Sequence, residues 1–261
     1  MEPARRLRER LQQRTLTLGA LVTDHVWPGV VELARRAGMD YLIVDMEHGP
    51  VSSECVADTC AAGRHQQFPV LIRPRANDYM SLRYAMDLGP CGFLLANVES
   101  AAELDLVQQA VYLPPRGRRR PGGVGNRWVS DLALASWQQQ VEADFLVLPQ
   151  IETRRGLERR TEIAAHPLTT ALAVGPFDLS AELGCCGDFT APVLQQALEQ
   201  IRSTAEQVGK PAWMYGPLSS QLARQGWYFL CLGEISGLLE QALRERCHEL
   251  HGEIRSTPIS Y

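Results

Sequence analysis

Charged and polar side chains stand directly after several short apolar runs of the sequence. These side chains are Asp45, Glu47, His48, Arg73, Asn97, Glu152 and Asp178. If the apolar runs are parallel strands of one barrel, their carboxyl ends share a rim, which is where catalytic groups gather in such folds. The pattern therefore predicts a single site built from residues that are far apart in the sequence.

Two carboxylates of this set, Glu152 and Asp178, end consecutive apolar runs. Carboxylate oxygens are the hard ligands that Mg²⁺ and Mn²⁺ prefer, and two of them leave positions open for water and a chelating substrate. Each residue also has a simpler interpretation. Asp178 would serve as a helix N-cap, and Glu152 as a surface ion-pair partner of Arg154 or Arg155. The pair, placed after near-continuous apolar runs, favours a divalent metal site.

His48 follows Asp45 by three residues in the segment Asp-Met-Glu-His-Gly. A carboxylate beside an imidazole fixes its tautomer and raises its basicity, so His48 is predicted to act as a general base rather than as a solvated loop histidine. Arg73 carries a planar guanidinium that suits a carboxylate or a developing enolate oxygen. The alternative for Arg73 is an ion pair with an acid at the rim.

A second group of arginines, which includes Arg119, lies between residues 116 and 120. It would suit an anionic substrate, although a solvated loop is the commoner fate of such a run. The group belongs to a long connection, residues 113–141, between two apolar runs. A connection of that length in a compact domain is usually functional or an interface arm.

Lys210 is the only lysine among the 26 Lys and Arg residues. Schiff-base chemistry needs a lysine amine at the reacting centre, and a lysine that enters a strand lies at the end of a barrel opposite to the site. Lysine-dependent aldolase chemistry and pyridoxal phosphate are therefore not expected. No Gly-x-Gly-x-x-Gly segment follows a predicted strand, so a nicotinamide cofactor is not expected either.

The 261 residues carry a formal net charge of -4, and the arginines are spread along the chain, so a nucleic-acid partner is not expected. No apolar run approaches the roughly 18 residues of a membrane-spanning helix. Residues 1–14 lack the apolar core of a secretory signal. We expect a cytoplasmic protein without a membrane partner, in which residues 1–14 form an N-terminal extension.

Eight short β-rich runs alternate with helical patterns, which is the order of a (β/α)₈ TIM barrel of the α/β class. The predicted strands are 16–22, 41–45, 70–73, 92–95, 145–151, 171–174, 212–215 and 228–232. The predicted helices are 29–37, 53–62, 79–88, 101–112, 154–165, 192–208, 221–225 and 237–251. Residues 15–261 are therefore expected to form one barrel domain.

Five segments of the chain, in order, resemble the HpcH/HpaI family of metal-dependent pyruvate aldolases. The segments are 37–41, 45–50, 72–74, 150–153 and 175–180, and the last two together are quite specific. The resemblance covers about residues 15–250. It implies a barrel whose C-terminal helix is exchanged between subunits of a homo-oligomer, a hexamer or a trimer. It also implies a carbon–carbon lyase that reversibly cleaves 4-hydroxy-2-oxo acids to pyruvate and an aldehyde or ketone.

The resemblance also implies a role for each matching residue. Glu152 and Asp178 match the ligands of a divalent metal, Mg²⁺, Mn²⁺ or Co²⁺, and Arg73 matches the arginine that holds the pyruvate enolate. His48 with Asp45 matches a dyad that acts through water as acid and base. The remaining matches are assigned to substrate binding, and they are Gln150, Gly175, Pro176, Phe177 and Arg119.

The chain departs from the family pattern near the expected substrate mouth. Ala96 and Asn97 stand where the family usually has proline followed by an apolar residue, and Arg120 and Pro121 stand where it usually continues with glycine. An aspartate past strand eight is replaced near Glu234 or Ile235. These departures leave the acceptor open and suggest a specialised enzyme as readily as a broad catabolic aldolase. The alternatives are an oxaloacetate decarboxylase, an enolate-condensing biosynthetic enzyme, or a non-catalytic barrel that binds 2-oxo acids.

Overall fold

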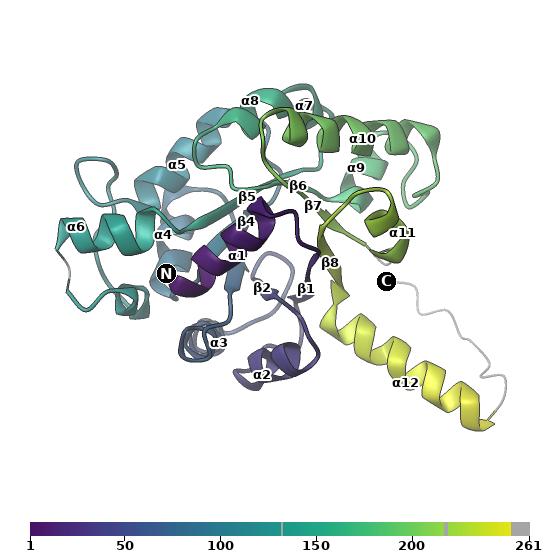
Figure 1. The fold of residues 1–261 in the computed structure, drawn as a ribbon, viewed down its shortest axis with the longest axis horizontal. Helices are drawn as coiled ribbons and strands as arrows, with labels where there is room; N and C mark the ends of the chain where they lie inside the picture. Colours follow the sequence, from purple (N-terminus) through teal and green to yellow (C-terminus); the bar gives the residue numbers. More distant parts are fainter. Residues whose placement is uncertain (132, 217–218, 252–261) are drawn as a thin grey trace.

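The structure, a computed structural model, describes residues 1–131, 133–216 and 219–251. Eight strands form a closed barrel in the order β1 to β8 (Figure 1). All neighbouring pairs are parallel, including β8 with β1. The strands are β1 (Thr17–Val22), β2 (Tyr41–Asp45), β3 (Val70–Arg73), β4 (Gly92–Leu95), β5 (Leu146–Ile151), β6 (Leu172–Val174), β7 (Ala212–Tyr215) and β8 (Phe229–Glu234). The predicted (β/α)₈ fold is confirmed, with the strands within two residues of their expected bounds.

The first helix precedes β1, and the other helices follow strands of the barrel. They are α1 (Glu2–Gln12), α2 (Gly29–Arg36), α3 (Ser53–His65), α4 (Tyr79–Asp87), α5 (Ala101–Val111), α6 (Leu134–Trp137), α7 (Arg154–Glu158), α8 (Arg160–Ala165), α9 (Pro176–Glu182), α10 (Pro192–Gln207), α11 (Ser219–Arg224) and α12 (Ile235–His251). The pattern over residues 154–165 forms two helices rather than one. Helix α9, which begins immediately after Gly175, was not predicted.

The barrel interior is filled by large side chains. The indole Nε1 of Trp213 donates a hydrogen bond to the hydroxyl of Tyr41 at 2.7 Å, and that hydroxyl donates to the carbonyl oxygen of Leu230 at 2.8 Å. A Cβ on Gly19 would overlap the ring of Tyr41, so this position needs glycine for close approach. The fully buried Trp213 also contributes to the floor of the cavity at the carboxyl ends of the strands.

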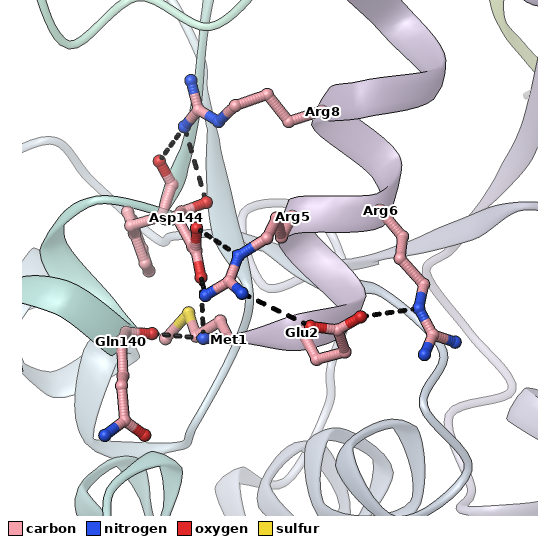
Figure 2. Close-up of polar contacts among 8 residues, drawn as sticks. Met1, Glu2, Arg5, Arg6, Arg8, Gln140 and Asp144 are labelled. Carbon is pink, nitrogen blue, oxygen red and sulfur yellow. Dashed lines mark hydrogen bonds and ion pairs between the residues drawn. The ribbon is translucent and has the colours of Figure 1, made fainter.

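Helix α1 packs across the opposite, N-terminal ends of the strands, although residues 1–14 were expected only as an extension. Leu7 and Leu11 are buried, and Arg8 donates to the carbonyl oxygen of Phe145 at 2.9 Å. Asp144, just before β5, accepts hydrogen bonds at 2.9 Å from Arg5 and from the ammonium group of Met1 (Figure 2). These contacts attach α1 to the segment that leads into β5.

The long connection over residues 113–141 folds back on its own barrel. The side chain of Trp137 is fully buried, and its Nε1 donates to the carbonyl oxygen of Val111 at 3.1 Å. The guanidinium of Arg119 lies over the Trp137 ring, 5.0 Å from the ring centroid. The segment also contains a 3-10 helix, η1 (Val124–Trp128), and a π-helical turn, η2 (Gln138–Glu142). Through these contacts, the described part of this connection packs against its own chain.

Helix α12 leaves the barrel after β8 and extends away from it (Figure 1). Leu239, Leu243 and Leu250 on this helix are more than half exposed, at 51%, 58% and 72%. An exchange of α12 between subunits stays a prediction. Among the described helices, none combines the length and the apolar composition needed to cross a membrane.

Candidate active site

A cavity of about 200 Å³ opens at the carboxyl ends of the barrel strands. Residues from seven of the eight strands or from the turns after them surround it. The lining residues are Leu21, Thr23, Asp45, His48, Arg73, Gln150, Glu152, Gly175, Pro176, Phe177, Asp178, Trp213, Tyr215 and Glu234. The structure therefore brings together in one cavity every residue that was given a catalytic, metal-binding or substrate-binding role, except Arg119. Glu47 and Asn97, which also stand at strand ends in the sequence, do not line the cavity.

Asp45 and Arg73 end the neighbouring strands β2 and β3 and are paired in register. Arg73 donates from Nε to one carboxylate oxygen of Asp45 at 2.9 Å and from Nη2 to the other at 2.5 Å. Both residues are buried. Burial opposes ionisation of Asp45, but the hydrogen bonds and charge of Arg73 outweigh it and hold the pKa of Asp45 below its usual value. The ion pair with an acid of the rim, which was the alternative interpretation of Arg73, is present, and it lies at the cavity.

The imidazole of His48 faces Glu47 rather than Asp45. Its Nε2 lies 3.7 Å from Oε2 of Glu47, and its side chain is 64% exposed. Asp45 instead accepts backbone N–H groups from Glu47 at 2.9 Å and from His48 at 3.4 Å. Glu47 also lies 3.3 Å from Nε of Arg73. The predicted contact between the Asp45 carboxylate and the His48 ring is thus not formed, and the Asp45 oxygens accept from Arg73 and from backbone N–H groups instead.

Glu152 follows β5 and is only 3% exposed. One of its oxygens accepts the backbone N–H of Asn97 at 2.9 Å. Asn97 has a φ of 52°, a left-handed conformation that asparagine tolerates better than most residues. Burial, together with the negative charge of Asp178, raises the pKa of Glu152 to about 7 although the N–H of Asn97 opposes the shift. This burial excludes the alternative of a surface ion pair with Arg154 or Arg155.

Asp178 lies in the first turn of α9, at the exposed edge of the cavity. The residue at the N-cap of α9 is Gly175, so Asp178 does not occupy the helix N-cap that its sequence context also allowed. A Cβ on Gly175 would overlap Oε1 of Glu152 and crowd the amide of Gln150. Glycine here lets the β6–α9 turn approach the β5 side chains, so Glu152 and Asp178 face the same cavity.

These residues fit a divalent ion. Glu152 is a buried carboxylate whose charged form is unfavourable without a cation, and Asp178 adds a second negative charge beside it. Oε1 of the buried Gln150 lacks a hydrogen-bond partner within the described part of the chain. In that same part, no group of three or more His, Cys, Asp or Glu side chains is arranged to hold a metal. Water and substrate would therefore have to complete the coordination shell.

A model of the family of HpcH/HpaI aldolases and citrate lyases matches residues 26–216. The chain belongs to the HpcH/HpaI family. A hydroxypyruvate/pyruvate aldolase from Pseudomonas aeruginosa is 30% identical over 259 residues, 96% of this chain and 94% of the relative. A second hydroxypyruvate/pyruvate aldolase, from Chromohalobacter salexigens, is 29% identical over 225 residues, 85% and 88% of the two chains. The crystal structure of an HpcH/HpaI aldolase from Desulfitobacterium hafniense has a TM-score of 0.86 at 22% identity and covers 97% of this chain and 99% of that one.

Membership of the HpcH/HpaI family confirms the prediction of an aldolase-type carbon–carbon lyase. Dependence on a divalent metal is general in the family. Two departures from the HpcH/HpaI pattern bear on the site. Asn97 supplies the N–H that orients Glu152, and Glu234, at the end of β8, lines the cavity.

The structure corrects one member of the predicted site. Arg119 does not line the cavity, because its side chain is buried within the fold of the 113–141 segment and donates to Asp87 at 2.9 Å and to Asn126 at 3.2 Å. Nearby Arg116 pairs with the buried carboxylate of Glu142 at 2.9 Å. These two arginines of the cluster stabilise the connection in the described chain instead of presenting an anion site.

Three polar residues at the ends of strands line the cavity but were not assigned to the site from the sequence, although Glu234 was noted there as a departure from the family pattern. Thr23 follows β1, Tyr215 ends β7 and Glu234 ends β8. The rule that identified Asp45 and Arg73, a polar residue at the carboxyl end of a strand, would have found all three. Lys210, by contrast, lies just before β7, where its Nζ donates to the carbonyl oxygens of Ala164 and His166, each at 2.6 Å.

Proposed function

We propose that the protein is a divalent-metal-dependent aldolase that makes and breaks a carbon–carbon bond through a pyruvate enolate. The observation that carries the proposal is the pairing of buried Glu152 with Asp178 in one cavity that also holds Arg73 and His48. The names of the relatives, hydroxypyruvate/pyruvate aldolases, support a small 2-oxo acid as one substrate. A divalent ion, Mg²⁺, Mn²⁺ or Co²⁺, held by the two carboxylates would act as a Lewis acid toward the 2-oxo group.

The 2-oxo acid would bind against β5, β6 and β3. Backbone N–H groups in the first turn of α9, around Phe177, would receive its carboxylate, because the first N–H groups of a helix lack partners within the helix. The unpartnered Oε1 of Gln150 would accept a hydrogen bond from bound water or substrate. Arg73, held in place by Asp45, would stabilise the negative charge that develops on the enolate oxygen.

His48 would move protons through water. In cleavage it would accept the proton of the 4-hydroxyl group as the C3–C4 bond breaks, the aldehyde leaves, and the bonding electrons enter the enolate. The protonated imidazole would then deliver a proton through water to C3 to give pyruvate. The exposed imidazole has access to the solvent that this relay requires, and Glu47 is the carboxylate placed to orient it.

Assembly and location are part of the same proposal. The apolar residues of α12, which extends from the barrel as Figure 1 shows, would be covered by another copy of the chain in a homo-oligomer, a trimer or hexamer, in the cytoplasm. A dilute-solution mass equal to one 29.0 kDa chain would contradict this assembly.

Exchange of the pyruvate methyl protons with D₂O tests the proposed chemistry, because exchange requires enolate formation but no aldehyde. We expect exchange, followed by NMR, that depends on Mn²⁺ or Mg²⁺, stops with EDTA and is lost in Glu152→Gln. The matched charge control is Glu158→Gln on α7. Exchange that is lost in Glu152→Gln but kept in Glu158→Gln shows the role of the Glu152 carboxylate. Exchange that persists undiminished with EDTA would contradict the metal-dependent mechanism.

A further inference from the structure

The charges around the cavity are strongly unequal. Four carboxylates line it, from Asp45, Glu152, Asp178 and Glu234, whereas Arg73 is the single guanidinium among the lining residues. That guanidinium is already engaged, by Asp45 through two hydrogen bonds and by Glu47 at 3.3 Å. A divalent ion and a pyruvate enolate, with its carboxylate, carry opposite charges of equal size. When both are bound, the excess of lining carboxylates over the single guanidinium therefore still makes the cavity negative.

The barrel order separates the groups that hold the 2-oxo acid from the rest of the cavity. Glu152 and Asp178 follow β5 and β6. Tyr215 and Glu234 end β7 and β8, and Thr23 follows β1, on another part of the ring. A second substrate that approaches the bound 2-oxo acid would therefore lie against this β7–β8–β1 wall. The polar groups that the wall presents to the cavity are a phenol, a hydroxyl and a carboxylate.

Glu234 is fixed in position on this wall. Its carboxylate accepts the backbone N–H of Thr23 at 3.3 Å and that of Gly237 at 3.1 Å. Ser236 donates its hydroxyl to the same carboxylate at 3.3 Å and also contacts Asp24, a further acid, at 3.4 Å. Burial, Cys231 and the negative charge of Glu234 raise the pKa of Tyr215, so that phenol stays neutral and able to donate a hydrogen bond.

We propose that the β7–β8–β1 wall selects an uncharged aldehyde as the second substrate, with Glu234 as the specificity-determining residue that disfavours aldehydes bearing a carboxylate. This inference rests on the proposed aldolase function and goes beyond it by assigning the charge class of the acceptor. Like charges brought together in a partly desolvated site repel, and none of the described lining residues on this wall offers a cation to offset a second carboxylate. Hydroxyl groups on an uncharged acceptor would find partners in Tyr215 and Glu234.

The test compares butanal with succinic semialdehyde, which has the same four-carbon chain with one carboxylate remote from the carbonyl. The full-length protein is assayed with Mn²⁺ and pyruvate for the aldol product, and kcat/KM is measured for each aldehyde. We expect butanal to be preferred about tenfold or more, and the preference to shrink as salt is raised. Glu234→Gln should reduce the preference several-fold, whereas Glu234→Asp should retain it.

Glu240→Gln is the matched control, because it removes one charge from α12 outside the cavity and should leave the preference unchanged. Equal use of the two aldehydes by the wild type, or a preference that Glu234→Gln leaves intact, would overturn the inference. If Glu234→Gln does not fold, the inference is tested by the aldehyde preference of the wild type, by the salt dependence of that preference and by Glu234→Asp. Exchange of the pyruvate methyl protons, measured without aldehyde, separates the two claims. If the wild type shows no exchange, the proposed aldolase function is refuted. If it shows exchange but uses both aldehydes equally, only the assignment of the acceptor is refuted.

Discussion

Asp45 holds Arg73 through both of its carboxylate oxygens, at 2.9 Å from Nε and 2.5 Å from Nη2. The two residues are in register on adjacent parallel strands, so the barrel itself sets this contact. It fixes the plane of the guanidinium beneath the cavity and leaves His48 to face Glu47. Asp45 is therefore a positioning residue for Arg73, and this assignment has consequences for several variants.

We expect Asp45→Asn and Arg73→Lys to lower kcat by similar factors, about 10²-fold, because each one misplaces the positive charge at the enolate oxygen. The double variant should be little worse than either single variant, since the two residues act as one unit. Steady-state kinetics of the three proteins would check this. If Asp45→Asn were non-additive with His48→Ala instead, Asp45 would serve the imidazole.

His48→Ala should lower turnover by a factor of about 10² to 10⁴, because it removes the group that transfers the proton. Binding of oxalate, a mimic of the pyruvate enolate, should be nearly unchanged in this variant. The comparison needs turnover at saturating metal together with an oxalate titration. His65→Ala, at the end of α3 and outside the cavity, is a matched control. Unchanged turnover in His48→Ala would remove the residue from the mechanism.

Glu152 makes the stability of the metal-free protein depend on pH. Its pKa of about 7 in the folded state exceeds the ordinary 4.5, so the folded state binds the proton more tightly than the unfolded state does. The stabilisation of the folded state that comes from this protonation is fully present below about pH 4.5. It is lost as the pH rises through about 7. By this linkage, Glu152→Gln should raise stability at pH 8 by on the order of 3 kcal/mol and change it little at pH 4.5.

Thermal unfolding with EDTA at both pH values measures this effect. Glu199→Gln, which removes one carboxylate from α10 outside the cavity, is the control variant. A Glu152→Gln variant that is less stable than the wild type at pH 8 would mean that the buried carboxylate is stabilised by a group other than a metal.

Gly175→Ala should displace Glu152, because the added Cβ would overlap its Oε1. We expect a loss of Mn²⁺ affinity of at least about tenfold and a destabilisation of about 1–3 kcal/mol from overpacking. Gly237→Ala on α12 provides the comparison, since an added Cβ there meets open space in a helix. Wild-type Mn²⁺ affinity in Gly175→Ala, measured by calorimetry, would show that the turn after β6 is more flexible than this packing implies.

The barrel could be predicted because its strands are near-continuous apolar runs, as in Leu146–Ile151, buried on both faces. The same apolar runs also located most of the site, because Asp45, Arg73 and Glu152 stand at the ends of these runs. Helix α1 was missed because its short apolar stripe, Leu7 and Leu11, lies among arginines that look solvated without the barrel beside them.

Pairings between strands could not be predicted from the sequence. The choice of Arg73 over His48 as partner of Asp45 depends on the register of β2 with β3, which no local pattern specifies. The burial of Arg119 depends on its contact with the ring of Trp137, which the fold of the 113–141 segment brings beside it. Arg116 and Arg119 were therefore candidates for an anion site in the sequence, whereas in the structure they pair with Glu142 and Asp87.

Calorimetric titration of Mn²⁺ into the metal-free protein, with and without oxalate, tests most directly whether Glu152 and Asp178 hold the metal that receives the 2-oxo acid. Two protein carboxylates alone should bind the ion loosely, and oxalate should raise the apparent affinity about tenfold or more because it completes the shell. Glu152→Gln and Asp178→Asn should each abolish this enhancement while circular dichroism shows an unchanged fold. Oxalate-enhanced Mn²⁺ binding that persists in both amide variants would contradict the metal site and the mechanism built on it.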